Sequence, residues 1–190
     1  MKKIISIALV SLLAVSCNSS SDSKDTKTAD TTKMADAKMG DTKAEKLDLP
    51  YTLDRAYAEW QPGNEQYAVT VMKGLKAFEN GDINACMDAF GDSVRIGFDY
   101  MQAKLGKDSL KSIITQRRAM YSSIKVKMED WESVISADKK EEWVTLWYKQ
   151  IQTNKKGITD SLVVVDDAKI VNGKMVVLDE KTQHLGPPKK

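Results

Sequence analysis

Cysteine is almost absent from this chain, with only Cys17 and Cys86 among 190 residues. Cys17 belongs to an N-terminal targeting segment, so Cys86 has no internal partner and no disulfide stabilises the folded part. Within its apolar surroundings in 83–90 we expect Cys86 to be a small buried residue rather than a reactive thiol. The sequence contains no zinc-ligand pattern, no phosphate-binding glycine loop and no nucleophile beside a base. We therefore expect no metal and no cofactor.

Long hydrophobic runs are missing as well, because a membrane-spanning helix takes about 20 apolar residues and none occurs. Residues 1–16 instead begin with Lys2 and Lys3 and continue with a short apolar run, which is typical of a secretory signal peptide. The five residues Leu13-Ala14-Val15-Ser16-Cys17 resemble the lipobox of bacterial lipoproteins, in which the cysteine is acylated and becomes the new N-terminus. The resemblance implies lipidation of Cys17 and anchoring in a bacterial cell envelope, facing the periplasm or the cell surface. Ordinary cleavage near a chance cysteine is the alternative.

Net charge is also lacking, because the formal charge of +2 falls to zero once Lys2 and Lys3 are removed with residues 1–16. No basic field remains to attract nucleic acid. Residues 17–46, which begin with the lipidated cysteine, contain no Leu, Ile, Val or aromatic residue and alternate Lys with Asp and Glu. Such a segment cannot bury enough apolar surface to offset the entropy of ordering. We expect it to be a disordered tether.

Helix signals begin after this segment. Residues 47–63 are expected to form a strap or short helix that ends at Pro62-Gly63. Asn64 is placed to cap a helix over 65–79, which carries an apolar stripe at helical spacing and ends at Gly81. Asp82 is expected to cap a second helix over 83–90. A third helix opens near 107–109, with Asp108 or Ser109 as its cap.

Strand signals fill the remainder of the chain. We expect one short strand at 94–98, between the second and third helices, and four long antiparallel strands after Ser123 at 125–137, 141–153, 159–171 and 174–185. The Asn172-Gly173 pair between two apolar runs is the strongest short signal for a hairpin. The order of helices followed by strands indicates an α+β fold, with the helices on one face of the sheet. Residues 187–190 form a tail.

Several short motifs in this order resemble the nuclear transport factor 2-like superfamily, and most closely its SnoaL-like branch, over 64–186. The motifs are Phe78-Glu79-Asn80-Gly81-Asp82 after the first helix, Gly106-Lys107-Asp108-Ser109-Leu110 at the third helix, and Val171-Asn172-Gly173-Lys174-Met175 at the last hairpin. The resemblance implies a cone, in which a strongly curved antiparallel sheet wraps around about three N-terminal helices and leaves a cavity at the open end. It implies no single function, since the superfamily includes isomerases, cyclases, dehydratases, ligand binders and non-catalytic interaction domains.

Enzymes of this superfamily often place an Asp or His in the cavity as a general base. On that resemblance the candidate acid/base residues are Asp99, Asp130 and His184, and the candidate ligand contacts are Tyr100, Arg117, Trp131 and Trp147. These residues can also be explained without a function. Asp99, Tyr100 and His184 would lie at solvated strand ends. The tryptophans, together with Trp143, would pack between the sheet and the helices, and the guanidinium of Arg117 would reach water. In Asp166-Asp167 one carboxylate points inward if the strand is regular, and a bulge would turn both outward.

The function we expect is binding of a small apolar ligand or a protein partner by a membrane-anchored cone domain without catalysis. A homodimer through the sheet face is compatible with the two-sided apolar pattern of 141–153. The alternative is an isomerase, cyclase or dehydratase type of enzyme that uses an acid/base residue in the cavity. An open cavity with a buried unpaired carboxylate would favour the enzyme.

Overall fold

One mixed sheet forms the frame of the folded part. The computed structural model describes residues 48–53, 58–99 and 101–186, and within these ranges the strand order is β1-β4-β5-β6-β7-β2-β3. The strands are β1 (Gln61–Pro62), β2 (Phe90–Phe98), β3 (Met101–Gly106), β4 (Tyr121–Ile135), β5 (Glu142–Asn154), β6 (Thr159–Val171) and β7 (Lys174–His184). The predicted signal peptide, Cys17, the tether, Tyr100 and the 187–190 tail lie outside the described residues.

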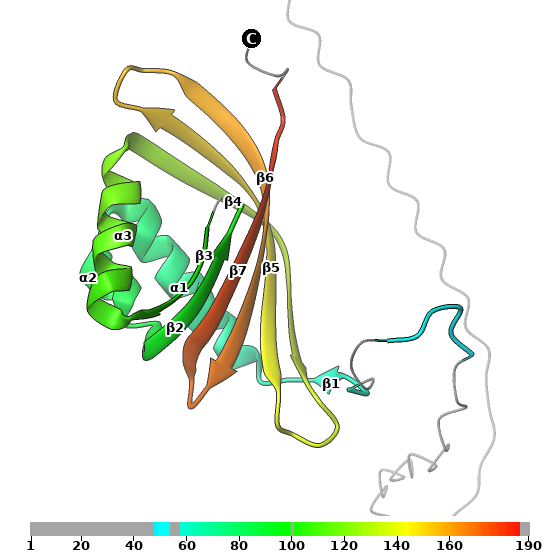
Figure 1. Ribbon diagram of the computed structural model, residues 1–190. Helices are drawn as coiled ribbons and strands as arrows, with labels where there is room; N and C mark the ends of the chain where they lie inside the picture. The colour runs from blue at the N-terminus through cyan, green and yellow to red at the C-terminus, as the bar shows by residue number, and fades with distance from the viewer. Residues whose placement is uncertain (1–47, 54–57, 100, 187–190) are drawn as a thin grey trace, which may run out of the picture. The chain divides into compact units, whose positions relative to one another are not determined.

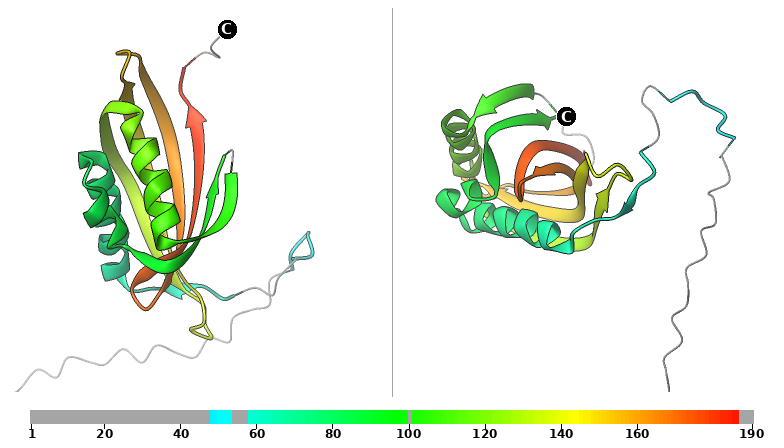
Figure 2. Two further views of the ribbon diagram at one scale, coloured as in Figure 1. Left: turned by 60° about the vertical axis from the view of Figure 1, so that its left-hand side comes forward. Right: turned by 90° about the horizontal axis from the view of Figure 1, so that it is seen from below.

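Three helices cover one face of this sheet, as Figures 1 and 2 show. They are α1 (Glu65–Asn80), α2 (Ile83–Met87) and α3 (Lys107–Ala119). The long α1 packs on β4 and β5, whereas α3 packs on β2 and β3. We call the sheet face under the helices the inner face and the opposite one the outer face. The expected α+β cone is confirmed.

The ends of α1 follow the expected local chemistry. Asn64 accepts a hydrogen bond from the backbone N–H of Gln66 at 3.0 Å, which satisfies one of the orphan donors at the helix start. Gly81 ends the helix with φ of 82°, a left-handed conformation that glycine adopts without strain. Asp82 then caps α2 by accepting from Ala85 N at 3.0 Å.

Some expectations were wrong in detail. The second helix stops at Met87 and not at residue 90, because Phe90 already belongs to β2. The third helix starts at Lys107 with Gly106 at the cap position, so neither Asp108 nor Ser109 caps it. The hairpin strand β3 was not predicted. The sheet is also not purely antiparallel, since β2 runs parallel to β7.

Alternation along the long strands separates the two faces. On β5 the buried side chains of Val144, Leu146 and Tyr148 face the helices. On β6 the same face carries Leu162 and Val164. Register shifts in β4, near Ser123 and Asp130, mark bulges that increase the local twist and help the sheet to curve. The concave side thus has an apolar lining that is closed by α1 and α3.

Candidate functional site

The inner face of β5, β6 and β7 forms the wall of a cavity of about 60 Å³. Because a water molecule needs roughly 10–15 Å³, the cavity has room for several waters or for a small ligand. Its apolar lining comes from helices and strands alike: Val71, Gly74, Leu75, Phe78, Cys86, Phe90, Phe98, Ile114, Met175 and Leu178. Five polar residues complete the lining: Arg117, Tyr148, Gln150, Asp166 and Glu180.

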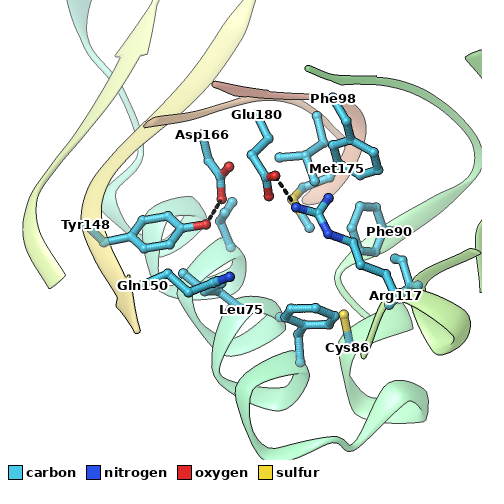
Figure 3. A pocket seen from close by; sticks show the side chains of 15 residues that line it. Leu75, Cys86, Phe90, Phe98, Arg117, Tyr148, Gln150, Asp166, Met175 and Glu180 are labelled. Atoms are coloured by element: carbon cyan, nitrogen blue, oxygen red, sulfur yellow. Dashed lines mark hydrogen bonds and ion pairs between the residues drawn. The ribbon is translucent and has the colours of Figure 1, made fainter. Parts of the chain in front are cut away.

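Asp166 is the central polar group of this cavity (Figure 3). Its side chain is almost completely buried, with 5% of the residue exposed. The hydroxyl of Tyr148 donates to Asp166 Oδ2 at 3.0 Å. The other oxygen, Oδ1, is buried and has no hydrogen-bond partner among the described residues. A buried polar atom without a partner costs roughly 1–3 kcal/mol, so a hydrogen bond to this oxygen would be favourable.

Glu180 is the cross-strand partner of Asp166 in the β6–β7 ladder. It forms an ion pair with the guanidinium of Arg117, which comes from α3. The same guanidinium lies 4.6 Å from the centre of the Phe98 ring, a cation–π distance. The guanidinium of Arg117 thus joins Glu180 on β7 to the Phe98 ring on β2.

The two carboxyl groups differ in protonation. Burial, and then the nearby charge of Glu180, raises the pKa of Asp166 well above its usual range, against the opposing effects of Tyr148 and Arg117. Burial is also the main reason why the pKa of Tyr148 lies well above its usual value, with the charge of Asp166 as the second cause. The surroundings of Asp166 therefore favour its neutral form, whereas Glu180 has the guanidinium of Arg117 beside it.

Gln150 and Cys86 also line the cavity. The Gln150 amide donates through Nε2 to Gln152 Oε1 at 2.9 Å. Burial raises the pKa of the Cys86 thiol to about 12, with the charge of Asp82 as a second cause. The thiol is thus an apolar wall group, as expected from the sequence, and it is not a nucleophile. Within the described ranges no cluster of residues is suited to hold a metal ion.

Of the residues predicted from the sequence, Arg117 lines the cavity. Asp99 is exposed at the end of β2 and accepts hydrogen bonds from Thr182. Asp130 is exposed on β4. His184 is exposed near the end of β7, where its Nδ1 lies 2.8 Å from Asp160 Oδ2. The structure brings none of these three into the cavity.

The predicted tryptophans also lie away from the cavity lining. Trp147 pairs with Val165 on the outer face of the sheet. Trp131 pairs with Leu146 and is 38% exposed. The tryptophans thus occupy both faces of the sheet rather than one wall.

Sequence reasoning missed Tyr148, Gln150 and Glu180 as cavity residues. The signal for the first two was the alternation of β5, which puts them on the same side as Val144 and Leu146. Asp166 was singled out only as one half of the Asp166-Asp167 pair. The strand is regular there, so Asp166 points inward and Asp167 outward, where Thr145 Oγ1 donates to it at 2.8 Å.

Solved structures share this fold at low sequence identity. A putative dehydratase of the NTF2-like family from Streptomyces avermitilis is 13% identical, with a TM-score of 0.53 over 61% of this chain and 93% of that chain. An NTF2-like protein of unknown function from Exiguobacterium sp. 255-15 is 14% identical, with a TM-score of 0.51 over 60% of this chain and 98% of that chain. An LEH-like epoxide hydrolase from M. tuberculosis is 14% identical, with a TM-score of 0.50 over 63% of this chain and 84% of that chain.

These likenesses show that the chain has the nuclear transport factor 2-like fold, as its motifs predicted. No protein-family model matches the chain, and no curated protein matches it in sequence. Proteins of this fold include enzymes and proteins without an assigned activity, so both ligand binding and catalysis are compatible with it. In the part of the chain that the structure describes, no helix is long and apolar enough to cross a bilayer.

Proposed function

We propose that the cone domain binds a small neutral molecule whose apolar body fills the cavity and whose hydrogen-bond acceptor meets Asp166. The observation that carries the proposal is the buried carboxyl of Asp166 in the cavity lining, whose Oδ1 has no hydrogen-bond partner among the described residues. Phe78, Phe90 and Leu75 supply the apolar wall for the body of the ligand. Apolar pockets with a few convergent polar groups are the usual form of small-molecule sites.

The protonation of Asp166 decides which polar group fits. Tyr148 donates to Oδ2, so the carboxyl proton is free to sit on Oδ1 and to point toward the ligand. A ketone, ester or ether oxygen accepts that proton in a hydrogen bond. A carboxylate ligand does not fit, because Arg117, the cation of the lining, is already paired with Glu180.

Two probes of similar size test this proposal. Acetone and isobutene have the same branched skeleton and differ in a carbonyl oxygen against a CH2 group, and both are small enough to suit a cavity of about 60 Å³. Their binding can be measured by NMR titration. We expect the protein to bind acetone about tenfold more tightly, the value of one hydrogen bond of about 1.4 kcal/mol. Asp166→Leu should remove the preference, whereas Asp167→Leu, which changes the outward-facing neighbour, should keep it. Equal binding of both probes by the wild-type protein contradicts the proposal.

Acid/base catalysis in the same cavity is the second candidate, and the buried unpaired carboxyl of Asp166 is the feature that we expected to favour an enzyme. It is also favoured by the juxtaposition of Asp166, whose pKa is raised by burial, with Glu180, which is paired with Arg117, because two carboxyl groups in different surroundings can supply the acid and the base of a reaction. The fold accommodates such chemistry, since one protein that shares it is an epoxide hydrolase. Propylene oxide, which is close to acetone in size, is a suitable substrate to test, with formation of the diol as the readout. Turnover that disappears in both Asp166→Asn and Glu180→Gln supports catalysis, and no turnover by the wild-type protein rejects it for epoxides.

We also propose that the chain is lipid-anchored through Cys17 in a bacterial cell envelope. The support is the signal-like segment 1–16 followed by the lipobox-like residues 13–17. In bacterial cells, radiolabelled palmitate should label the wild-type protein and fail to label Cys17→Ala. Label retained on the variant would refute acylation at this residue.

A homodimer through the outer face of the sheet remains part of the proposal. The support is that Trp143, Trp147 and Val165 are only partly buried on that face. Analytical ultracentrifugation should give a dimer for the wild-type protein and a monomer for Trp147→Lys. A wild-type monomer at high concentration would contradict it.

A further inference from the structure

We propose that the end of the domain around the β5–β6 turn docks on an anionic lipid bilayer. Three large apolar side chains are about half exposed at this end: Met120 at 53%, Ile158 at 51% and Leu185 at 52%. They belong to three different parts of the chain, the end of α3, the β5–β6 turn and the end of β7. Exposed large apolar side chains that gather on one surface mark an interaction site more often than scattered ones.

Backbone hydrogen bonds place these three residues beside the same turn. Lys155 N donates to Met120 O at 3.3 Å, and Asn154 N donates to Ile158 O at 2.9 Å. On the other side of β6, Leu185 N donates to Ser161 O at 3.0 Å. Because neighbouring strands lie ~4.8 Å apart, the three positions span roughly 15 Å across the strand ends. Figures 1 and 2 show the β5–β6 turn at the same end of the domain as the C-terminal end of β7.

Two exposed lysines lie in the β5–β6 turn. Lys155 and Lys156 are exposed in the turn, and among the described residues neither has an ion-pair partner. The nearby carboxylate of Asp160 is already engaged by His184. The β4–β5 turn at the other end of the sheet is different, because there Lys140 pairs with Asp138 at 3.1 Å.

The exposed apolar side chains and the neighbouring lysines suit a lipid surface better than a groove on a partner protein. The apolar residues lie on a turn and on element ends, where they are about half exposed, and they are not among the residues that line the cavity. Protruding apolar side chains enter the boundary between headgroups and acyl chains, while neighbouring lysines attract anionic headgroups. The inference does not depend on the ligand of the cavity or on lipidation of Cys17.

Vesicle co-sedimentation tests the proposal on a chain of residues 18–190, which cannot be anchored through Cys17. Residues 50–190 form their own compact unit and contain the whole described core, so this chain folds without the first 17 residues. We expect it to bind vesicles of phosphatidylglycerol and phosphatidylcholine, and to bind pure phosphatidylcholine at least tenfold more weakly. Since each lysine near an anionic surface is worth roughly fivefold in partitioning, Lys155→Glu/Lys156→Glu should weaken binding by roughly 25-fold or more.

A matched double variant distinguishes a local binding site from an effect of the overall charge of the protein. Lys139→Glu/Lys140→Glu makes the same charge change at the opposite turn and should change partitioning less than threefold. Met120→Ser/Ile158→Ser should weaken binding at least fivefold with no change in charge. All six side chains are exposed, and thermal melts will show that the variants fold. A wild-type chain that does not bind anionic vesicles overturns the proposal. An equal loss of vesicle binding in both lysine double variants overturns it as well. If the surface binds only a protein partner, the surface belongs to that partner instead.

Discussion

Asp166 and Glu180 face each other across β6 and β7, and both side chains line the same cavity. Arg117 pairs with Glu180 and leaves Asp166 to be stabilised by the hydroxyl of Tyr148 alone. Two carboxyl groups this close do not both ionise readily in a buried site. The sheet register thus places two carboxyl groups in different surroundings side by side, and the raised pKa of Asp166 gives a measurable pH dependence.

The first prediction concerns stability against pH. In an unfolded chain the carboxyl of Asp166 ionises near pH 3.8, whereas in the folded protein burial keeps it protonated to a much higher pH. Between these two values the unfolded state binds fewer protons, so the free energy of unfolding falls as pH rises. Relative to Asp166→Asn, the wild-type protein should lose about 1.4 kcal/mol per pH unit above pH 4. Urea unfolding at a series of pH values from 4 to 8 measures this slope.

The control for this slope is Asp92→Asn, which changes an exposed carboxylate at the start of β2. It should run parallel to the wild-type protein across the same range. A difference between Asp166→Asn and the wild type that stays constant with pH would show that Asp166 is ionised in the folded state.

The second prediction concerns Arg118, which joins three elements. Its guanidinium donates to Phe78 O and Tyr121 O at 3.0 Å each and to Glu79 O at 3.2 Å, and so ties the end of α1 to the junction of α3 and β4. Arg118→Met should reduce the free energy of unfolding by about 2–3 kcal/mol, because three carbonyl groups lose a charged donor. Arg95→Met, at an exposed arginine of β2, should change it by less than about 0.5 kcal/mol. Comparable losses for both would refute the special role of Arg118.

The third prediction concerns the close approach of α1 to the segment after α2. A Cβ on Gly74 would lie 2.8 Å from the Cβ of Ala89, closer than carbon atoms pack. Gly74→Ala should therefore destabilise the protein by about 1–3 kcal/mol, although alanine alone favours a helix interior by roughly 0.5–1 kcal/mol. The double variant Gly74→Ala/Ala89→Gly should recover much of the loss in urea unfolding, because the clash is gone. Additive losses would mean that the two positions do not touch.

The fourth prediction concerns the thiol of Cys86, the sole cysteine of a chain of residues 18–190. With a pKa of about 12, its thiolate fraction at pH 8 is roughly a thousandfold below that of a free cysteine of pKa ~8.5. Labelling with a chromogenic disulfide reagent should be slower by at least that factor in the folded protein and fast in urea. Rapid labelling without denaturant would show that the cavity opens often enough to expose the thiol.

Local signals in the sequence predicted much of the fold. Asn64, Gly81 and Asp82 act at the helix ends as expected, and the Asn172-Gly173 hairpin joins β6 and β7. These elements could be predicted because the residues that decide them lie within one turn of the chain. The same holds for the two faces of β5, which follow from strict alternation.

Long-range pairings could not be predicted in this way. The strand β3 is short, and the alternation of Met101, Ala103 and Leu105 becomes meaningful only once β2 lies beside it. Which carboxylate of Asp166-Asp167 points inward depends on the register with β5 and β7. The ion pair between Arg117 and Glu180 forms only when α3 packs on the sheet, so no local sequence pattern predicts it.

The parallel pairing of β2 with β7 has a consequence for the rate of folding. The strand β7 lies between β6 and β2, so it joins the hairpin of β2 and β3 to the rest of the sheet. Without β7 the hairpin has no strand neighbour in the sheet, and the cavity lacks the wall that carries Glu180. Because β2 and β7 are far apart in sequence, this pairing adds long loop closures, which slow folding.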